Sequence, residues 1–469
     1  MNRKLMHTTA YVIPTILIGL LLNCGVGTLR SDDKISPATL RAESQDKALL
    51  PIAAAATSTL VAHAASDPAL PRDFALPSPP FAPDSAWNQV ATQTAVSPTS
   101  DQQILVTYRV LLGDDSSLSP GMEAPNWPFM YVNYDDYTIP VFRMGEALRS
   151  VQIRDYYGTL GWTNPKLPIE QAGGPVTVPA PAGTVRPAGP DGPEGKDADG
   201  HLVLYNPDTF MAYDFWQATT ARDAEGNSLG GGRPGTEIFE AGMIDFFDVQ
   251  GPGVNPDTYS SARATGVPLL AGLILPEDVE SGAIEHGLAV AIPGLRNTSD
   301  DSSEPLSSDY FYPASTTETD FYNTNPHALA AGQRIRLKQT IVDDEGNEVN
   351  KNDLAPITQM FLTALRTYGA YVVDNAGGFT FYAEDIHTAV LDLSDDQVNE
   401  LIGQPPGTSL PAGKTRWQIV IEKLNEELEQ IPIAYGPEGQ DPAEATITKS
   451  NFEVVIMHTV YLPLVLRNH

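Results

Sequence analysis

The chain of 469 residues contains one cysteine, Cys24, close to the N-terminus. A single thiol rules out a disulfide framework, so this is not a small scaffold stapled by cross-links. It also excludes thiol catalysis and cysteine-ligated metal centres in the folded part. The hydrophobic content of 42% is enough for a sizeable core without such staples.

Basic residues are scarce. The sequence has 28 Lys and Arg against 59 Asp and Glu, which gives a formal net charge of −31. Such a field repels phosphate, and nucleic-acid binding requires clustered cations. We therefore predict no nucleic-acid partner and no binding to anionic lipid surfaces.

The motifs that identify common enzyme classes are also missing. No glycine loop of the phosphate-binding type, no G-x-S-x-G elbow and no H-E-x-x-H helix is present. The longest apolar run, from Ala10 to Leu22, is short and is interrupted by Pro14, so we predict no transmembrane domain. Any chemistry must rest on histidines and carboxylates.

The N-terminus has the pattern of an export signal. Arg3 and Lys4 precede the apolar run, and Cys24 follows it directly. A lipoprotein signal carries its lipidated cysteine at such a place, although Asn23 stands where a small residue is usual. Two alternatives stay open, a chain released by cleavage and a chain anchored by a lipid on Cys24. Both predict a secreted or extracellular protein.

Four parts are expected along the chain. Residues 1–24 form the export signal and 25–83 an Ala/Pro/Ser-rich tether. A β-rich core domain follows over 84–392, and 393–469 form a helical segment with a C-terminal strand and tail.

Short alternating runs predict a mainly β fold, a jelly-roll-like β-sandwich with a few peripheral helices in the C-terminal half. Turn-forming residues at 343–347 and 374–378 predict hairpins. The runs expected to form strands are 104–110, 137–144, 200–206, 288–293, 334–342, 370–375 and 379–384. Helical spacing and capping boxes predict helices over 355–368, 395–402 and 416–430.

The candidate catalytic residues are two carboxylates and two histidines. Asp214 and Asp248 lie in runs rich in aromatic residues, where a carboxyl pKa rises as a general acid requires. Paired carboxylates on neighbouring strands suit glycoside hydrolysis. His201 and His286 sit at strand edges near acids and are candidate bases or orienting groups. The structural alternative, caps and ion pairs within the fold, stays open for each of them.

The candidate binding residues are aromatic and charged. Flat rings beside acids often stack on sugars, and aromatic residues crowd at 127–137, 213–216 and 310–322. Arginines that alternate on one strand could hold a carboxylated sugar or form salt bridges with this acidic surface. The predicted substrate-binding residues are Trp216, Tyr213, Glu285, Arg334 and Arg336.

No cofactor or resident metal is predicted. Two acidic stretches, 197–200 and 343–347, resemble fragments of calcium loops, but neither continues to a glutamate at the EF-hand position. Solvated turns are the default interpretation, and weak Ca²⁺ binding is the alternative.

Several segments resemble a family of exported bacterial proteins whose activity is not established. The resemblance spans about Trp87 to Gly378 and supports homology rather than a particular chemistry. The family pattern has a basic or histidine-containing segment where this chain has 313–316. The segments that carry the resemblance are HLVLYNPDTF, ATGVPLLAGLILPEDV, IEHGLAV, GQRIRLK and ALRTYGAYVVDN.

Two functional hypotheses follow from these patterns. The first is a secreted or surface-tethered enzyme that acts on a polysaccharide as a glycoside hydrolase or a lyase. The second is a non-catalytic surface protein that binds glycan or cell-wall material. Convergence of His201, Asp214, Asp248 and His286 in one cleft would favour the enzyme, and their scatter would favour the binding or structural protein.

Overall fold

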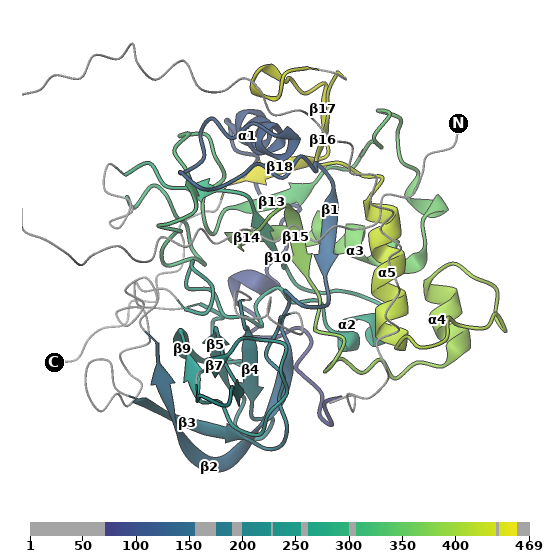
Figure 1. Ribbon diagram of the computed structural model, residues 1–469. Coiled ribbons are helices and arrows are strands. Elements are labelled where there is room, and N and C mark those ends of the chain that lie inside the picture. Colours follow the sequence, from purple (N-terminus) through teal and green to yellow (C-terminus); the bar gives the residue numbers. More distant parts are fainter. Residues whose placement is uncertain are drawn as a thin grey trace, which may run out of the picture. The chain divides into compact units, whose positions relative to one another are not determined.

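A computed structural model describes residues 71–154, 175–189, 199–226, 228–254, 261–299, 306–437 and 440–456 (Figure 1). All of these residues belong to one compact unit. The expected export signal, most of the expected tether and the C-terminal tail lie outside the described residues. Residues 71–83, which we expected in the tether, instead pack against the core, where Leu76 and Phe81 are buried.

The larger part of the core is built on a six-stranded mixed sheet in the order β1-β15-β10-β14-β13-β18. The pairs β1–β15 and β10–β14 are parallel, and the other three pairs are antiparallel. The strands are β1 (Met130–Asn133), β10 (Leu288–Ile292), β13 (Arg334–Leu337), β14 (Ala370–Asn375), β15 (Phe379–Tyr382) and β18 (Phe452–Val455).

A second sheet has the order β3-β2-β4-β5-β9, with β8 also paired to β2. It encloses a smaller core of its own around Phe142, Leu204 and Phe215. Its strands are β2 (Val141–Ile153), β3 (Pro175–Pro181), β4 (Leu202–Tyr205), β5 (Met211–Trp216), β8 (Glu240–Ala241) and β9 (Met243–Asp248). Three two-stranded ribbons join β6 (Ala221–Arg222) to β7 (Ser228–Leu229), β11 (Leu295–Arg296) to β12 (Tyr322–Asn323), and β16 (Ala434–Tyr435) to β17 (Lys449–Ser450).

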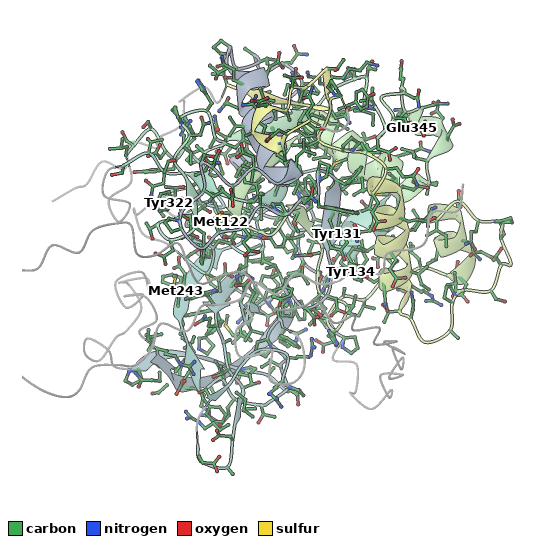
Figure 2. The ribbon with its side chains drawn as sticks, turned by 45° about the horizontal axis from the view of Figure 1, so that its top comes forward. Met122, Tyr131, Tyr134, Met243, Tyr322 and Glu345 are labelled. Carbon is green, nitrogen blue, oxygen red and sulfur yellow. The ribbon has the colours of Figure 1, made fainter. Side chains whose placement is uncertain are left out.

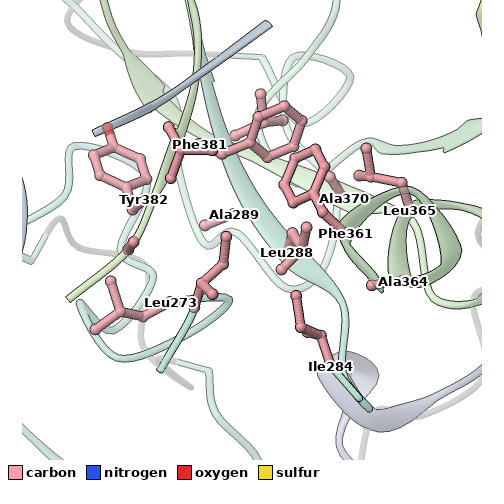
Figure 3. Close-up of a cluster of buried hydrophobic side chains, with 14 of the residues drawn as sticks. Leu273, Ile284, Leu288, Ala289, Phe361, Ala364, Leu365, Ala370, Phe381 and Tyr382 are labelled. Atoms are coloured by element: carbon pink, nitrogen blue, oxygen red, sulfur yellow. The ribbon is translucent and has the colours of Figure 1, made fainter. Parts of the chain in front are cut away.

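Helices pack on the first sheet. Phe361 of α3 meets Phe381 of β15 edge to face at 5.0 Å between ring centroids. Figure 3 shows this contact on the face of β10 that carries Leu288, while Ala289 faces Leu273 on the other side. The helices are α1 (Ser100–Leu112), α2 (Pro276–Ser281), α3 (Pro356–Thr367), α4 (Asp395–Leu401), α5 (Arg416–Leu428), and the 3₁₀ turns η1 (Ala86–Asn88), η4 (Lys351–Asp353) and η5 (Pro442–Glu444).

The mainly β class is confirmed, with 27% of the described residues in strands and 18% in helices. The jelly-roll-like sandwich is not confirmed, because the first sheet contains parallel pairs and carries α3 and α5 against it. Parallel neighbours need crossover connections, and here the connection from β10 to its parallel neighbour β14 runs through β13 and α3.

Two local predictions were wrong. Residues 104–110 form part of helix α1, because Gln103, Ile104, Thr107, Tyr108 and Leu111 recur on one buried face at helical spacing. The turn at 374–378 does not close a hairpin, since β10 inserts between β14 and β15. The predicted helices over 355–368, 395–402 and 416–430 are confirmed as α3, α4 and α5 within one or two residues.

The capping box of α4 gives a simple stability prediction. Ser394 Oγ accepts a hydrogen bond from the Gln397 N–H, and the Gln397 side chain accepts one from the Ser394 N–H at 2.9 Å. We expect Ser394→Ala to lower the free energy of unfolding by about 1 kcal/mol. Urea unfolding measures it, and Ser394→Asp, which restores a capping oxygen, serves as the matched control. Equal losses for the two variants would contradict the capping role.

Candidate functional site

Asp214 lies on β5 directly opposite Asp245 on β9. Ala212 on β5 joins the larger core, while Tyr213 and Phe215 face the smaller one. Since side chains alternate along a strand, Asp214 points with Ala212 toward the larger core. Both carboxyl groups are almost completely buried.

Burial raises the pKa of Asp214 to about 7. The Leu269 N–H donates to Asp214 Oδ2 at 2.6 Å and acts against the rise, whereas the charge of Asp245 adds to it. The other oxygen, Oδ1, has no hydrogen-bond partner among the described residues. The Asp214 carboxyl is therefore partly protonated at neutral pH.

Arg263, whose charge acts on Asp214, is fully buried. Its Nη1 donates to the carbonyls of Pro268 and Ala271 at 3.0 and 2.9 Å, and its guanidinium lies 5.0 Å from the centre of the Tyr382 ring. Nε and Nη2 have no hydrogen-bond partner in the described chain. Burial lowers the pKa of Arg263, and the nearby charge of Asp374 offsets part of that cost.

His201 borders the same group. Its Nε2 lies 3.3 Å from the Ala262 carbonyl, and Nδ1 has no partner within the described part of the chain. Burial lowers its pKa, and the charge of Arg263 lowers it further, against a rise from Asp199. We call Asp214, Asp245, Arg263 and His201 the buried Arg263 cluster. It brings together two predicted catalytic residues, but in a place with almost no solvent exposure.

The other two predicted catalytic residues lie elsewhere. Asp248 is exposed at the end of β9, where its Oδ1 accepts from the Gln250 N–H at 2.8 Å and closes a turn. His286 is fully buried, with Nε2 at 3.1 Å from Asp278 Oδ2 and Nδ1 at 3.0 Å from the Gly287 carbonyl. Burial alone would lower the pKa of His286, but Asp278 raises it above the usual value. With both nitrogens bonded, His286 has no free atom for a substrate.

The predicted binding residues do not converge either. Tyr213 stacks on Phe246 at 5.8 Å on the face of β5 opposite Asp214. The ring of Trp216 covers Gly242, where an added Cβ would approach it to 2.7 Å. Glu285 is exposed beside the buried His286.

Arg334 and Arg336 bind the N-terminal segment to the sheet. Arg334 Nε donates to the Tyr368 carbonyl at 2.6 Å and its Nη2 to the Gln89 carbonyl. Arg336 pairs with Glu453 on β18, with 2.8 Å from Nε to Oε1. Arg336 thus forms a salt bridge, whereas the printed bonds of Arg334 go to main-chain carbonyls.

A second group of titratable residues combines three half-buried side chains with two buried ones, and no sequence pattern selected it. It contains Asp135, Asp136, Asp385, His387 and Arg186, which we call the acid–histidine cluster. The turn that carries the first two residues and the loop after β15 are joined by main-chain bonds. Asp385 N donates to the Ile139 carbonyl at 3.2 Å and Ile386 N to the Tyr134 carbonyl at 3.0 Å.

The buried side chain of Asp385 orients the ring of His387. The Asp385 side chain is 1% exposed, whereas that of His387 is 27% exposed. His387 Nδ1 lies 2.7 Å from Asp385 Oδ1, so Nδ1 carries the hydrogen and Nε2 is left for solvent or a substrate. Arg186 Nη1 approaches the same ring nitrogen to 3.0 Å while its Nε is held by the Gly232 carbonyl. Burial lowers the pKa of His387, but the bond to Asp385 outweighs it and the pKa is raised.

The acidic turn faces this histidine. Burial raises the pKa of Asp136 to about 6, with a further rise from the neighbouring charge of Asp135, and Arg186 acts against it. Burial and the charge of Asp385 also raise the pKa of Asp135. Asp136 adopts a left-handed backbone with φ of 50°, a conformation that aspartate tolerates better than most residues.

Tyrosines form one side of the acid–histidine cluster. Figure 2 shows Tyr131 and Tyr134 beside α5, and both side chains are half-buried. Burial and the charge of Asp135 raise the pKa of Tyr131 to about 12, so its hydroxyl keeps its proton. Part of the aromatic run at 127–137 thus lies next to acids, which the sequence hinted at. No sequence pattern pointed to His387, because it lies far along the chain from the residues at 127–137.

Metal chemistry finds no support among the described residues, where no group of three or more histidine, cysteine or acidic side chains could hold an ion. In the turn at 343–347, Asp343 Oδ1 accepts from the main-chain N–H groups of Glu345 and Asn347, as in an ordinary solvated turn. In the described segments, no helix is long and apolar enough to cross a membrane.

Comparison with protein-family models, with curated proteins and with solved structures finds no match to this chain.

Proposed function

We propose that this protein is a glycan-acting enzyme that hydrolyses glycosidic bonds at the acid–histidine cluster. The observation that carries the proposal is the half-exposed His387, oriented by a buried Asp385 and placed with the turn carboxylates of Asp135 and Asp136. Acid–base catalysis requires two such groups with different pKa values in one accessible place. The buried Arg263 cluster lacks that accessibility.

The pKa directions assign the roles. Asp136, with a pKa of about 6, is the base, and the protonated His387, whose pKa is raised, is the acid. Asp136 takes a proton from water while the water oxygen attacks the anomeric carbon. The bond from that carbon to the leaving oxygen breaks, and His387 Nε2–H protonates this oxygen. Exchange with solvent then returns both groups to their starting states.

Hydrolysis fits this site better than elimination does. A lyase binds a uronate, which would put another carboxylate next to three acids, Asp135, Asp136 and Asp385. The guanidinium of Arg186 is already held by the carbonyls of Gly232 and Gly189. Neutral or cationic sugars avoid this repulsion, and the rings of Tyr131 and Tyr134 offer apolar faces to a pyranose.

The proposal is tested with the purified chain on a panel of polysaccharides, by release of reducing ends. We expect Asp136→Asn and His387→Gln each to lower kcat/KM by about 10²–10⁴-fold, the usual contribution of a general acid or base. Asp248→Asn, in an exposed turn, is the matched control and should retain activity. Unchanged activity in both cluster variants would place the reaction elsewhere.

The pH profile provides a second prediction. Activity should rise with pH through about 6 as Asp136 loses its proton, and fall at higher pH as His387 loses its own. Because the carboxylate of Asp385 raises the pKa of both groups, Asp385→Asn should move both limbs to lower pH. A purely structural role for Asp385 would lower activity without moving the limbs. The measurement is kcat/KM against pH for the two proteins.

A non-catalytic glycan-binding protein is the second candidate. Trp127 is 41% exposed and packs edge to face on Phe129 at 5.1 Å, which leaves a flat ring open to solvent near the start of β1. Retarded migration in polysaccharide-containing gels, lost in Trp127→Ala and without any new reducing ends, would favour this function over hydrolysis.

The proposed place of action is outside the cell, as a secreted or surface-tethered protein. The export pattern before Cys24 and the acidic composition support it. Mass spectrometry of the chain recovered from an expressing bacterium tests this, since an intact N-terminus on cytoplasmic protein would contradict export.

A further inference from the structure

A run of three glycines, 230–232, lies against the segment that follows β3. The Gly232 N–H donates to the Pro187 carbonyl at 2.9 Å, and Gly232 has a left-handed backbone with φ of 80°. At Gly231 an added Cβ would approach the Ala188 carbonyl oxygen to 2.2 Å, so a larger residue would have to move that segment. The glycine run therefore fixes the main chain at 187–188 by close approach.

The same segment carries Arg186, whose guanidinium is held by two main-chain carbonyls. Arg186 is 4% exposed, and its Nε donates to the Gly232 carbonyl at 3.0 Å while Nη2 donates to the Gly189 carbonyl at 3.2 Å. These two bonds direct Nη1 to His387 Nδ1, at 3.0 Å. The guanidinium thus stays beside the histidine as long as both carbonyls keep their places.

Opposite charges act on the His387 ring from different parts of the chain. Burial lowers the pKa of His387 and the bond to Asp385, on the same loop, raises it, while Arg186 from the segment after β3 lowers it again. The acidic turn contributes Asp135, which raises this pKa, and the charge of Asp136 also interacts with the ring. An imidazolium bonded to a buried carboxylate gives up its proton less readily, and a guanidinium beside it counteracts this retention.

We infer that Arg186 is a positioning residue for His387, and that the glycine run 230–232 holds its guanidinium against the imidazole. A lysine would carry the same charge, but it lacks the rigid fork of donors that fixes the direction of Nη1. The consequence for catalysis, control of how readily the acid of the site releases its proton, rests on the proposed function. The placement of the guanidinium can be measured without any substrate.

An NMR titration of the imidazole hydrogens measures the pKa of His387, and His387→Gln assigns its resonance. Arg186→Gln removes the positive charge and should raise the measured pKa by about 1. Gly231→Ala keeps the charge but displaces the Ala188 carbonyl and the guanidinium with it, so the pKa should rise in the same direction. Gly183→Ala, at an exposed glycine of the same segment with open space around it, is the matched control and should leave the pKa unchanged.

An unchanged or lowered pKa of His387 in a folded Arg186→Gln or Gly231→Ala variant would overturn the inference. The wild type provides a measurement that does not depend on folding of the variants. We expect a nuclear Overhauser contact between the guanidinium hydrogens of Arg186 and Hε1 of His387, and its absence would equally overturn the placement.

The kinetic arm separates the positioning role from the proposed reaction. In an active protein, Arg186→Gln should move both limbs of the pH profile to higher pH, because the guanidinium also opposes the rise that burial causes in the pKa of Asp136. A lower kcat/KM with unmoved limbs would leave Arg186 a structural role alone and overturn the inference, while hydrolysis stands. A raised pKa of His387 in a chain that cleaves no glycan would support the positioning role and overturn the hydrolase.

Discussion

Asp214→Asn should make the protein more stable at pH 8 and leave its stability nearly unchanged at pH 4. The carboxyl has a pKa of about 7 in the folded chain and an ordinary value of 3.8. Between these values the folded state holds a proton that the unfolded state has released, so stability falls as pH rises through about 7. Asparagine resembles the neutral carboxyl and can still accept from the Leu269 N–H.

The expected difference is large because the side chain is completely buried. A shift of about three pKa units corresponds to about 4 kcal/mol, which the wild type loses progressively between about pH 4 and pH 7 and the variant does not. Urea unfolding of both proteins at several pH values measures it. Asp248→Asn, a change at an exposed carboxyl three positions from Asp245, is the control and should show no such trend. A difference of the same size at pH 4 and pH 8 would contradict the explanation from the raised pKa of the buried Asp214.

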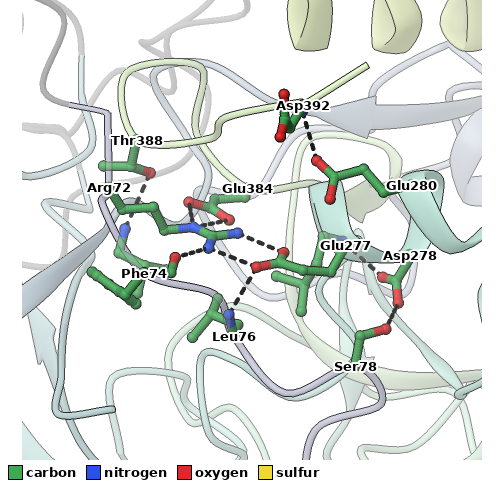
Figure 4. Close-up of polar contacts among 12 residues, drawn as sticks. Arg72, Phe74, Leu76, Ser78, Glu277, Asp278, Glu280, Glu384, Thr388 and Asp392 are labelled. Atoms are coloured by element: carbon green, nitrogen blue, oxygen red, sulfur yellow. Dashed lines mark hydrogen bonds and ion pairs between the residues drawn. The ribbon is translucent and has the colours of Figure 1, made fainter. Parts of the chain in front are cut away.

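Replacement of Arg72 should have the second large effect. Arg72 Nε lies 2.8 Å from Glu384 Oε1, and its Nη1 and Nη2 donate to Glu277 at 2.7 and 2.6 Å (Figure 4). The side chains of Arg72 and Glu384 are 3% and 0% exposed. Removing one partner of a buried pair leaves an uncompensated charge, so Arg72→Met should lower the free energy of unfolding by about 3–5 kcal/mol.

A double-mutant cycle separates this cost from lost packing. Glu384→Gln in the Arg72→Met background removes the unpaired charge and should recover much of the loss. Arg143→Met is the matched control, because Arg143 also lies over the Phe74 ring but pairs with an exposed Asp73, and it should cost less than about 1 kcal/mol. Similar losses at both arginines would show that burial of the pair does not matter.

Arg72 is also linked to the acid–histidine cluster. Its main-chain N–H donates to the Thr388 carbonyl at 3.0 Å, and Glu384 directly precedes Asp385. The segment that sequence composition assigned to a tether thus fixes the loop that carries His387. Composition could not reveal this, because a single buried arginine does not change the Ala/Pro/Ser character of its surroundings.

Local patterns predicted many elements correctly. The alternating runs at 288–293 and 370–375 became β10 and β14, and the capping box at Ser394 begins α4. These predictions held because they depend on residues within a few positions of one another. The run at 104–110 failed because its short apolar stretch fits both periods, and burial against β18 selected the helix.

The candidate site shows the limit of such patterns. The sequence identified Asp214 as a carboxyl in an apolar setting, and it placed acids beside aromatic residues at 127–137. Pairing Asp214 with Asp245 rather than Asp248 depends on the register of β5 and β9, since a shift along a strand changes which side chains are opposite.

The sequence alone determined the mainly β class, the acidic charge and the absence of thiol chemistry, since these follow from composition and short-range periodicity. Only the tertiary structure decided that β10 separates β14 from β15, and that the turn at 134–137 meets the loop at 384–388. The physical reason is that main-chain hydrogen bonds bring together segments that are some 250 residues apart in the sequence. The burial that results shifts the pKa of Asp136 and of His387.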